Sequence, residues 1–148
     1  MGLFAAFDIS AAGMNLERTR LDVAAANLAN AHTTQTPNGQ VFQPMRVVAR
    51  PVVGQEFDAL VRVMGAGSAV AAEPFEISVE SVNTPPRMVY DPSHPDANQQ
   101  GFVAYPDINP VSEMVQLIGI GRAYEANVKA MNMAKSMSLK ALEIGSSA

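Results

Sequence analysis

The sequence contains no cysteine and no tryptophan, and its apolar runs are short. Without cysteine, the chain can form neither a disulfide framework nor a thiolate metal site. No apolar run approaches the roughly 20 residues that cross a bilayer. The opening stretch MGLFAAFDIS has no basic residue and carries Asp8, unlike a cleavable secretory signal. The sequence therefore predicts neither a membrane span nor a cleaved leader.

An excess of basic residues is missing as well. Ten Lys and Arg residues stand against 14 Asp and Glu residues, which gives a formal net charge of −4 over 148 residues. Such a balance provides no broad positive surface for phosphate backbones, so nucleic acid is not an expected partner. The hydrophobic content of 48% is enough for one ordinary domain, or for a small domain with extensions.

Residues with catalytic or metal-binding chemistry are few. The two histidines, His32 and His94, do not have the spacing of a metal site. Asp96 follows His94 closely, but a pair flanked by prolines is more often a solvated turn than a catalytic pair. Gly119 and Gly121 lack the rest of a phosphate-binding loop, and they indicate close helix approach or a bend. We expect no cofactor and no small-molecule substrate; a hydrolase would require a polar pocket around His94.

The N-terminal region reads as one amphipathic helix from Phe7 to Leu28. Its apolar residues step alternately by four and three positions, as in a heptad seam, with one charged interruption. Such a stripe must be covered by a partner. The seam consists of Phe7, Ala11, Met14, Arg18, Leu21, Ala25 and Leu28.

The C-terminal region, Pro110 to Ile144, reads as a second helix with two apolar rows. The two rows together make a stripe wider than a two-stranded coiled coil needs, so this helix could contact two neighbours. A small middle domain cannot cover so much surface, which favours assembly. The first row is Met114, Leu117, Gly121, Tyr124, Val128, Met131 and Leu142, and the second is Ile120, Ala123, Asn127, Ala130, Ala134, Met137 and Ala141.

Between the helices the character of the sequence changes to short clusters of β-branched residues. RVVARPVV, ALVRV and FEISVES indicate strands, Asn38-Gly39 after Pro37 indicates a turn, and TPPR and YDPSHPDANQQG indicate loops. The expected fold class is α+β, with long terminal helices packing as a coiled-coil-like pair around an inserted β-rich domain. The expected parts are residues 1–33, 34–107 and 108–148.

Two asparagines stand near the expected end of the first helix, although asparagine favours caps and turns over helix interiors. We predict that Asn30 ends the helix in a left-handed backbone conformation, so that glycine could replace it and valine could not. We predict that Asn27 binds backbone near the helix end or a neighbouring subunit. The alternative is that both side chains face water.

The stretch LDVAAANLANAHTT resembles the Ala-Asn-Leu-Ala-Asn motif that ends a helix in axial proteins of the bacterial flagellum. The tail, with Arg122, Tyr124 and Asn127, resembles the matching C-terminal signature. The PNG turn and the YDPSHPDANQQGFVAYPDINPV block are most similar to proximal members of the flagella basal body rod protein family. Another rod or hook-basal-body component is the alternative; TTQTPNGQVF is longer than the corresponding turn of the distal relatives.

This resemblance implies a structural subunit of the proximal rod, the periplasmic drive shaft that transmits motor torque. It implies export by the flagellar type III apparatus without a cleaved signal peptide. The implied partners are other proximal and distal rod proteins and the membrane ring or export-gate adaptor at the rod base. The expected subunit-interface residues are Phe7, Met14, Leu21, Asn27, Leu28, Asn30, Leu117, Tyr124, Asn127, Val128, Met131 and Leu142.

Overall fold

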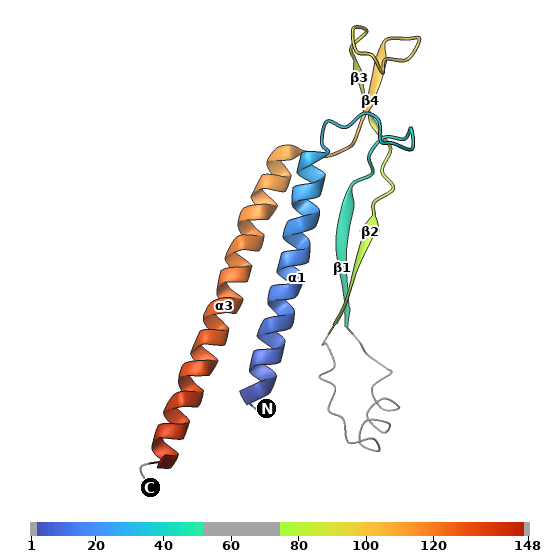
Figure 1. Ribbon diagram of the computed structural model, residues 1–148. Helices are drawn as coiled ribbons and strands as arrows, with labels where there is room; N and C mark the ends of the chain where they lie inside the picture. Colours follow the sequence, from blue (N-terminus) through green and yellow to red (C-terminus); the bar gives the residue numbers. More distant parts are fainter. Residues whose placement is uncertain (1–2, 52–74, 147–148) are drawn as a thin grey trace, which may run out of the picture. The chain divides into compact units, whose positions relative to one another are not determined.

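A computed structural model describes residues 3–51 and 75–146 of the chain (Figure 1). Along the chain, four short strands lie between two long helices in the described residues, which confirms the α+β class. The expected strand ALVRV lies outside the described residues. The elements in chain order are α1 (Leu3–Ala29), β1 (Met45–Pro51), β2 (Phe75–Ser81), β3 (Arg87–Tyr90), β4 (Phe102–Tyr105) and α3 (Pro110–Ser146).

The contacts divide the chain into two compact units. The first comprises Met1–Arg18, Ala49–Ser78 and Arg122–Ala148. The second comprises Thr19–Val48 and Val79–Gly121. Each unit therefore contains a part of both helices and a part of the β-rich region.

In the first unit, α1 and α3 run antiparallel (Figure 1), and they pack together, as the sequence predicted. The two helices approach closely at Gly13, where an added Cβ would lie 2.9 Å from Nδ2 of Asn127. Ser10 and Glu17 of α1 are buried, whereas Ala11 and Arg18 of the predicted seam are exposed. The buried positions of α1 in this unit therefore include small and polar residues, and the predicted apolar seam is not among them.

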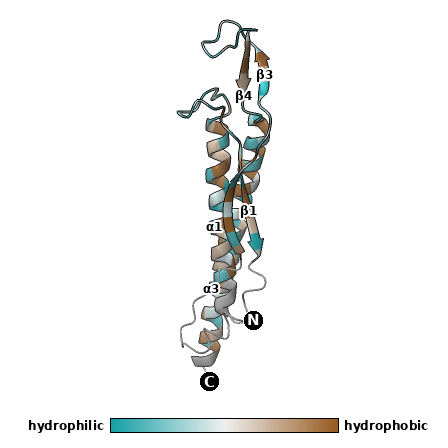
Figure 2. Ribbon diagram, turned by 90° about the vertical axis from the view of Figure 1, so that its right-hand side faces the viewer, coloured by the Kyte–Doolittle hydropathy of each residue, from teal (hydrophilic) through white to brown (hydrophobic). Residues whose placement is uncertain are grey.

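The second unit contains an antiparallel hairpin of β3 and β4, in which Arg87 pairs with Tyr105 and Tyr90 with Phe102. Val103 on its inner face is fully buried. The outer face exposes Met88, Tyr90 and Phe102, and Figure 2 shows apolar colouring on both strands. The sequence reading missed this hairpin, because a strand of four residues has only two inward positions and gives almost no period-two signal.

A separate two-stranded sheet pairs β1 with β2. In the second unit its end is fixed where the backbone N–H of Val82 donates to the carbonyl oxygen of Pro44 at 2.7 Å. Arg46 and Glu80 form an exposed ion pair across the strands at 3.4 Å. The two strands lie within or overlap the predicted segments RVVARPVV and FEISVES, so β-branched clusters located this sheet correctly.

The predicted turn at Asn38-Gly39 is confirmed. The backbone N–H of Gly39 donates to the carbonyl of Thr36 at 2.8 Å, and the Thr36 N–H donates to the carbonyl of Gln40 at 2.8 Å. Gly39 has a φ of 75°, which completes a type I turn followed by a glycine bulge. Proline at the second position and glycine at the fourth are the residues that this turn prefers.

The interpretation of Gly119 and Gly121 as a close helix approach is wrong, and the alternative of a local bend stays a prediction. A Cβ added at either glycine would meet no atom within 4 Å, and α3 continues through both positions. Two isolated glycines lower helix propensity without by themselves specifying a contact.

Candidate assembly surface

Asn27 lies on the inner face of α1 in the second unit, with only 4% of the residue exposed. Its Nδ2 donates to the carbonyl oxygen of Met45 at 2.8 Å, and its Oδ1 accepts the Met45 N–H at 2.9 Å. The side-chain amide of Asn27 therefore binds both the N–H and the carbonyl of Met45, the first residue of β1, as the backbone of a neighbouring strand would. The prediction that Asn27 binds backbone is confirmed, and the alternative that it merely faces water is wrong.

Asn30 does not end the helix as predicted. No non-glycine residue in the described ranges 3–51 and 75–146 has a positive φ, so Asn30 is not left-handed. Its Nδ2 donates to the carbonyl of Ala26 at 2.8 Å, and its Oδ1 accepts the hydroxyl of Thr33 at 3.2 Å. After Asn30, the Ala31 N–H donates to the carbonyl oxygen of Leu28, three residues earlier, so the last turn is tighter than an α-helical turn. The side-chain amide therefore caps the helix by adding a second donor to the Ala26 carbonyl, which already accepts the Asn30 backbone N–H at 3.1 Å.

This geometry changes the expected behaviour of Asn30 variants. A left-handed position would make Asn30→Gly more stable than Asn30→Ala, because only glycine avoids the Cβ penalty there. The observed cap makes both variants lose the same two side-chain bonds, so we expect each to lower the free energy of unfolding by about 1 kcal/mol. Urea denaturation compares the two. A clear advantage for the glycine variant would contradict the capped conformation.

The predicted seam of α1 is not buried by the chain itself. Ala11, Arg18, Leu21 and Ala25 are exposed, and the remaining members are half-buried: Phe7, Met14 and Leu28. The buried positions of this helix form a different ladder, rotated about the helix axis. They are Ser10, Ala12, Glu17, Val23, Ala24 and Asn27.

α3 likewise leaves much of its predicted stripe uncovered. Leu142 is 70% exposed and Tyr124 is 42% exposed, whereas Leu117, Asn127, Val128 and Met131 are half-buried. Ala134 of the second row is the residue that is buried. Further large apolar residues of α3 are exposed outside the predicted first row, namely Val111, Val115, Ile118, Met133, Met137, Leu139 and Ile144.

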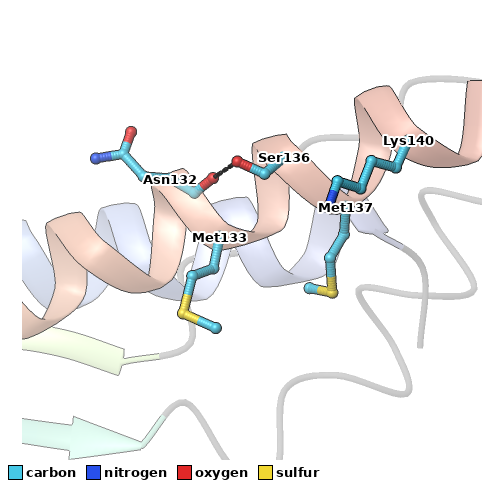
Figure 3. Close-up of a pocket in the computed structure, with 5 residues that line it drawn as sticks. All are labelled: Asn132, Met133, Ser136, Met137 and Lys140. Atoms are coloured by element: carbon cyan, nitrogen blue, oxygen red, sulfur yellow. Dashed lines mark hydrogen bonds between the residues drawn. The ribbon is translucent and has the colours of Figure 1, made fainter.

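An open groove of about 290 Å³ runs along α3 in the first unit (Figure 3). Met133 and Met137, one helical turn apart, extend their thioethers on the same side, and Asn132, Ser136 and Lys140 complete the lining. The Ser136 hydroxyl donates to the carbonyl of Asn132 at 3.0 Å, so it is satisfied within the helix. The groove offers flexible apolar contact and carries no pair of groups suited to acid–base catalysis.

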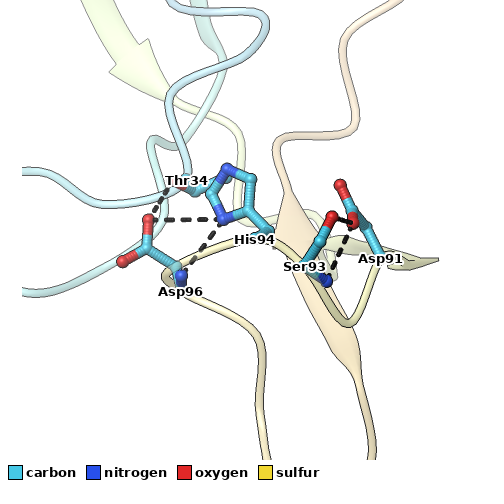
Figure 4. A network of polar contacts seen from close by, with 5 residues as sticks. All are labelled: Thr34, Asp91, Ser93, His94 and Asp96. Carbon is cyan, nitrogen blue, oxygen red and sulfur yellow. Dashed lines mark hydrogen bonds and ion pairs between the residues drawn. The ribbon is translucent and has the colours of Figure 1, made fainter.

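The histidine and the carboxylate that the sequence placed together do meet in the β3–β4 loop (Figure 4). Nδ1 of His94 lies 3.9 Å from Oδ2 of Asp96, which is longer than a hydrogen bond. The pKa of Asp91 is lowered, first by the hydroxyl of Ser93 and then by the Ser93 N–H and the nearby His94. Among the described residues, no group of three His, Asp or Glu side chains could hold a metal ion. The contacts of this cluster are those of an ordered loop.

No helix within the described part of the chain is long and apolar enough to cross a membrane.

Comparison with known proteins connects both ends of the chain with flagellar proteins. Residues 7–34 match the family described as "Flagella basal body rod protein". Residues 99–144 match "Flagellar basal body rod FlgEFG protein C-terminal". The matched ranges contain most of α1 and nearly all of α3, so the recognised segments include both uncovered helical stripes.

Relatives that match over nearly the whole chain are also flagellar rod proteins. The chain is 38% identical to the flagellar basal-body rod protein FlgC of Bacillus subtilis, over 98% of this chain and 99% of the relative. It is 36% identical to FlgC of Borreliella burgdorferi, over 97% and 98%. It is 36% identical to FlgC of Salmonella typhimurium, over 98% and 99%. The chain therefore belongs to the FlgC family of flagellar basal-body rod proteins and is a structural subunit of the basal-body rod.

Proposed function

We propose that this subunit occupies the proximal rod and assembles through the outward faces of α1 and α3, so that torque passes from subunit to subunit through buried helical contacts. The observation that carries the proposal is the α1 seam, whose seven members are all exposed or half-buried in the isolated chain. Apolar stripes of this kind mark association surfaces on proteins that work in assemblies.

The interface residues that we propose are eleven of the twelve expected from the sequence. Asn27 acts differently, because its amide is buried and bonded to Met45 and cannot reach another subunit. The others remain on surfaces that a neighbouring subunit could cover or adjoin: Phe7, Met14, Leu21, Leu28, Asn30, Leu117, Tyr124, Asn127, Val128, Met131 and Leu142.

The proposed partners are other proximal and distal rod proteins and the membrane ring or export-gate adaptor at the base of the rod. The proposed location is the periplasmic part of the basal body, reached through the type III export apparatus without cleavage of a signal peptide. The names of the relatives, flagellar basal-body rod proteins, support this placement. The same relatives support a role without catalysis, since a rod subunit acts through its contacts.

Substitutions on the seam test the proposal. We expect Leu28→Asp and Met131→Asp to abolish rod assembly and swimming, because an unpaired charge buried at a subunit contact costs about 3 kcal/mol or more. Both side chains are only half-buried in the chain itself, so the monomer should still fold. Soft-agar motility and isolation of basal bodies measure assembly, and thermal denaturation of the purified variants measures folding.

Matched controls are available nearby on each helix. Ala29→Asp and Ala126→Asp introduce the same charge at exposed positions outside the predicted rows and outside the groove lining. We expect these two variants to swim nearly as well as the wild type at equal export. Normal swimming by the Leu28 and Met131 variants would show that these residues do not face a buried contact and would remove the basis of the proposed assembly face.

A further inference from the structure

Residues 36–40 form a closed turn in the loop after α1. The Gly39 N–H donates to the carbonyl oxygen of Thr36 at 2.8 Å, and the Thr36 N–H donates to the carbonyl oxygen of Gln40 at 2.8 Å. The Thr36 hydroxyl donates to the same Gln40 oxygen at 2.7 Å. Asn38 and Gly39 are both exposed. The turn is therefore open to solvent, while its backbone is held by local hydrogen bonds.

Asn38 is the only asparagine in the sequence that is followed by glycine. The side-chain carbonyl carbon of asparagine is an electrophile, and the backbone nitrogen of the next residue is a nucleophile that can reach it through a five-membered ring. A side chain on that next residue hinders the approach, and glycine has none. A Cβ added at Gly39 would meet no atom within 4 Å, so the space beside this nitrogen is open.

The reaction that this pair permits is deamidation through a cyclic imide. The Gly39 nitrogen forms a bond to Cγ of Asn38, the bond from Cγ to Nδ2 breaks, and ammonia leaves with the proton that the Gly39 nitrogen gives up. Water then opens the ring at one of its two carbonyls. One opening gives aspartate, and the other gives isoaspartate, in which the main chain runs through Cγ. Either product adds a negative charge to the turn at neutral pH.

The folded turn opposes this ring closure in two ways. The Gly39 N–H is bonded to Thr36, so the nitrogen must leave this bond before it attacks. Asn38 stands at the third position of a type I turn, where ψ is about 0° and the next nitrogen points away from the side chain. Ring closure requires a rotation about the Cα–C bond of Asn38, and that rotation breaks the turn. The reaction therefore starts from an opened turn.

We propose that Asn38 is a self-modification site, at which the chain converts to aspartate and isoaspartate at a rate set by the opening of the turn. The substrate is the chain itself, and the co-reactant is water. The proposal goes beyond rod assembly and does not depend on it, so it can be tested on the unassembled chain.

The test compares the full-length chain in native buffer and in guanidinium chloride, at the same mildly alkaline pH and the same temperature. Peptide mass spectrometry locates each deamidated residue, and electron-transfer fragmentation distinguishes isoaspartate from aspartate. We expect Asn38 to convert faster than every other asparagine in both solvents. Its conversion in native buffer should be about fivefold slower than in denaturant, as for a reaction that must first break one ordinary hydrogen bond.

Two threonine variants show whether the turn controls the rate. Thr36→Val keeps the shape of the side chain and removes its bond to Gln40, so conversion in native buffer should become about threefold faster, with no change in denaturant. Thr33→Val removes a hydroxyl bond to Asn30 in the same loop but outside the turn, and it should change neither rate. Circular dichroism checks that both variants stay folded.

Three results would overturn the proposal. The first is equal conversion of wild-type Asn38 in the two solvents, which needs no variant. The second is faster deamidation at another asparagine of the folded chain. The third is a folded Thr36→Val variant that converts no faster than Thr33→Val in native buffer.

Discussion

Asn27→Asp lowers the free energy of unfolding by about 3 kcal/mol at neutral pH, although the two side chains have nearly the same shape. The change removes the donor to the Met45 carbonyl and places a carboxylate oxygen against that carbonyl at the 2.8 Å separation of the present bond. The site is 4% exposed, so water cannot replace the lost contact. A buried carbonyl without a donor and a buried charge without a partner each carry a penalty. Urea denaturation measures the difference.

The pH dependence of this variant identifies the cause. Burial and the facing carbonyl raise the pKa of the introduced carboxyl in the folded state above its unfolded value. The penalty is therefore present at neutral pH and diminishes as pH falls through the raised pKa, because the protonated group again donates to Met45. Asn132→Asp, at an exposed position of α3, should show a small effect with little recovery in acid. Equal losses in the two variants would mean that the Asn27–Met45 pair does not stabilise the fold.

Gly101→Ala lowers the free energy of unfolding by about 3 kcal/mol, whereas Gly39→Ala lowers it by about 1 kcal/mol. The two glycines have similar backbone conformations, with φ of 80° and 75°. They differ in space: a Cβ on Gly101 would lie 2.9 Å from Cε2 of Tyr90 and 3.2 Å from Cβ of Pro92, while one on Gly39 meets nothing within 4 Å. The difference between the two losses of unfolding free energy therefore measures the steric cost of the added Cβ at Gly101.

Thermal or urea denaturation of both glycine variants provides the measurement, and tyrosine fluorescence reports on the β3–β4 hairpin. Gly101 is buried where that hairpin begins its second strand, so its alanine variant should also disturb the Tyr90–Phe102 contact at 5.3 Å. Similar losses of unfolding free energy for the two variants would show that the hairpin accommodates the added methyl group at Gly101 with little strain. Phe102→Leu, which weakens the ring contact without adding a Cβ, is a useful comparison.

Much of the secondary structure was predictable because its signals are local. The four-three ladders located α1 and α3 to within a few residues at each end, and β-branched clusters located β1 and β2. The turn at Gly39 was predictable because proline and glycine each restrict the backbone in a known way. β3 and β4 were missed because pairing between two four-residue strands depends on contacts across an 11-residue loop, which no local pattern records.

The inner face of α1 could not be predicted from apolar periodicity. It consists of short and polar side chains, among them Ser10, Gly13, Glu17 and Asn27, and hydrophobicity scales assign these to the solvent face. Two of them have a particular neighbour: Asn127 lies opposite Gly13, and Met45 pairs with Asn27. Sequence alone identified Asn27 as unusual and could not supply its partner, which lies 18 residues further along the chain.

The pairing of Asn27 with Met45 also fixes where the intervening segment begins and ends. Since both ends are held at one point, the excursion between them is a closed loop whose length has little influence on the register of β1. Its tip at Asn38 and Gly39 is exposed and turns through its own local bonds. Doubling the length of a flexible loop costs only about 0.6 kcal/mol in closure entropy. A peptide tag could therefore be inserted at this tip, which makes the position a suitable handle for labelling the subunit without altering either helix.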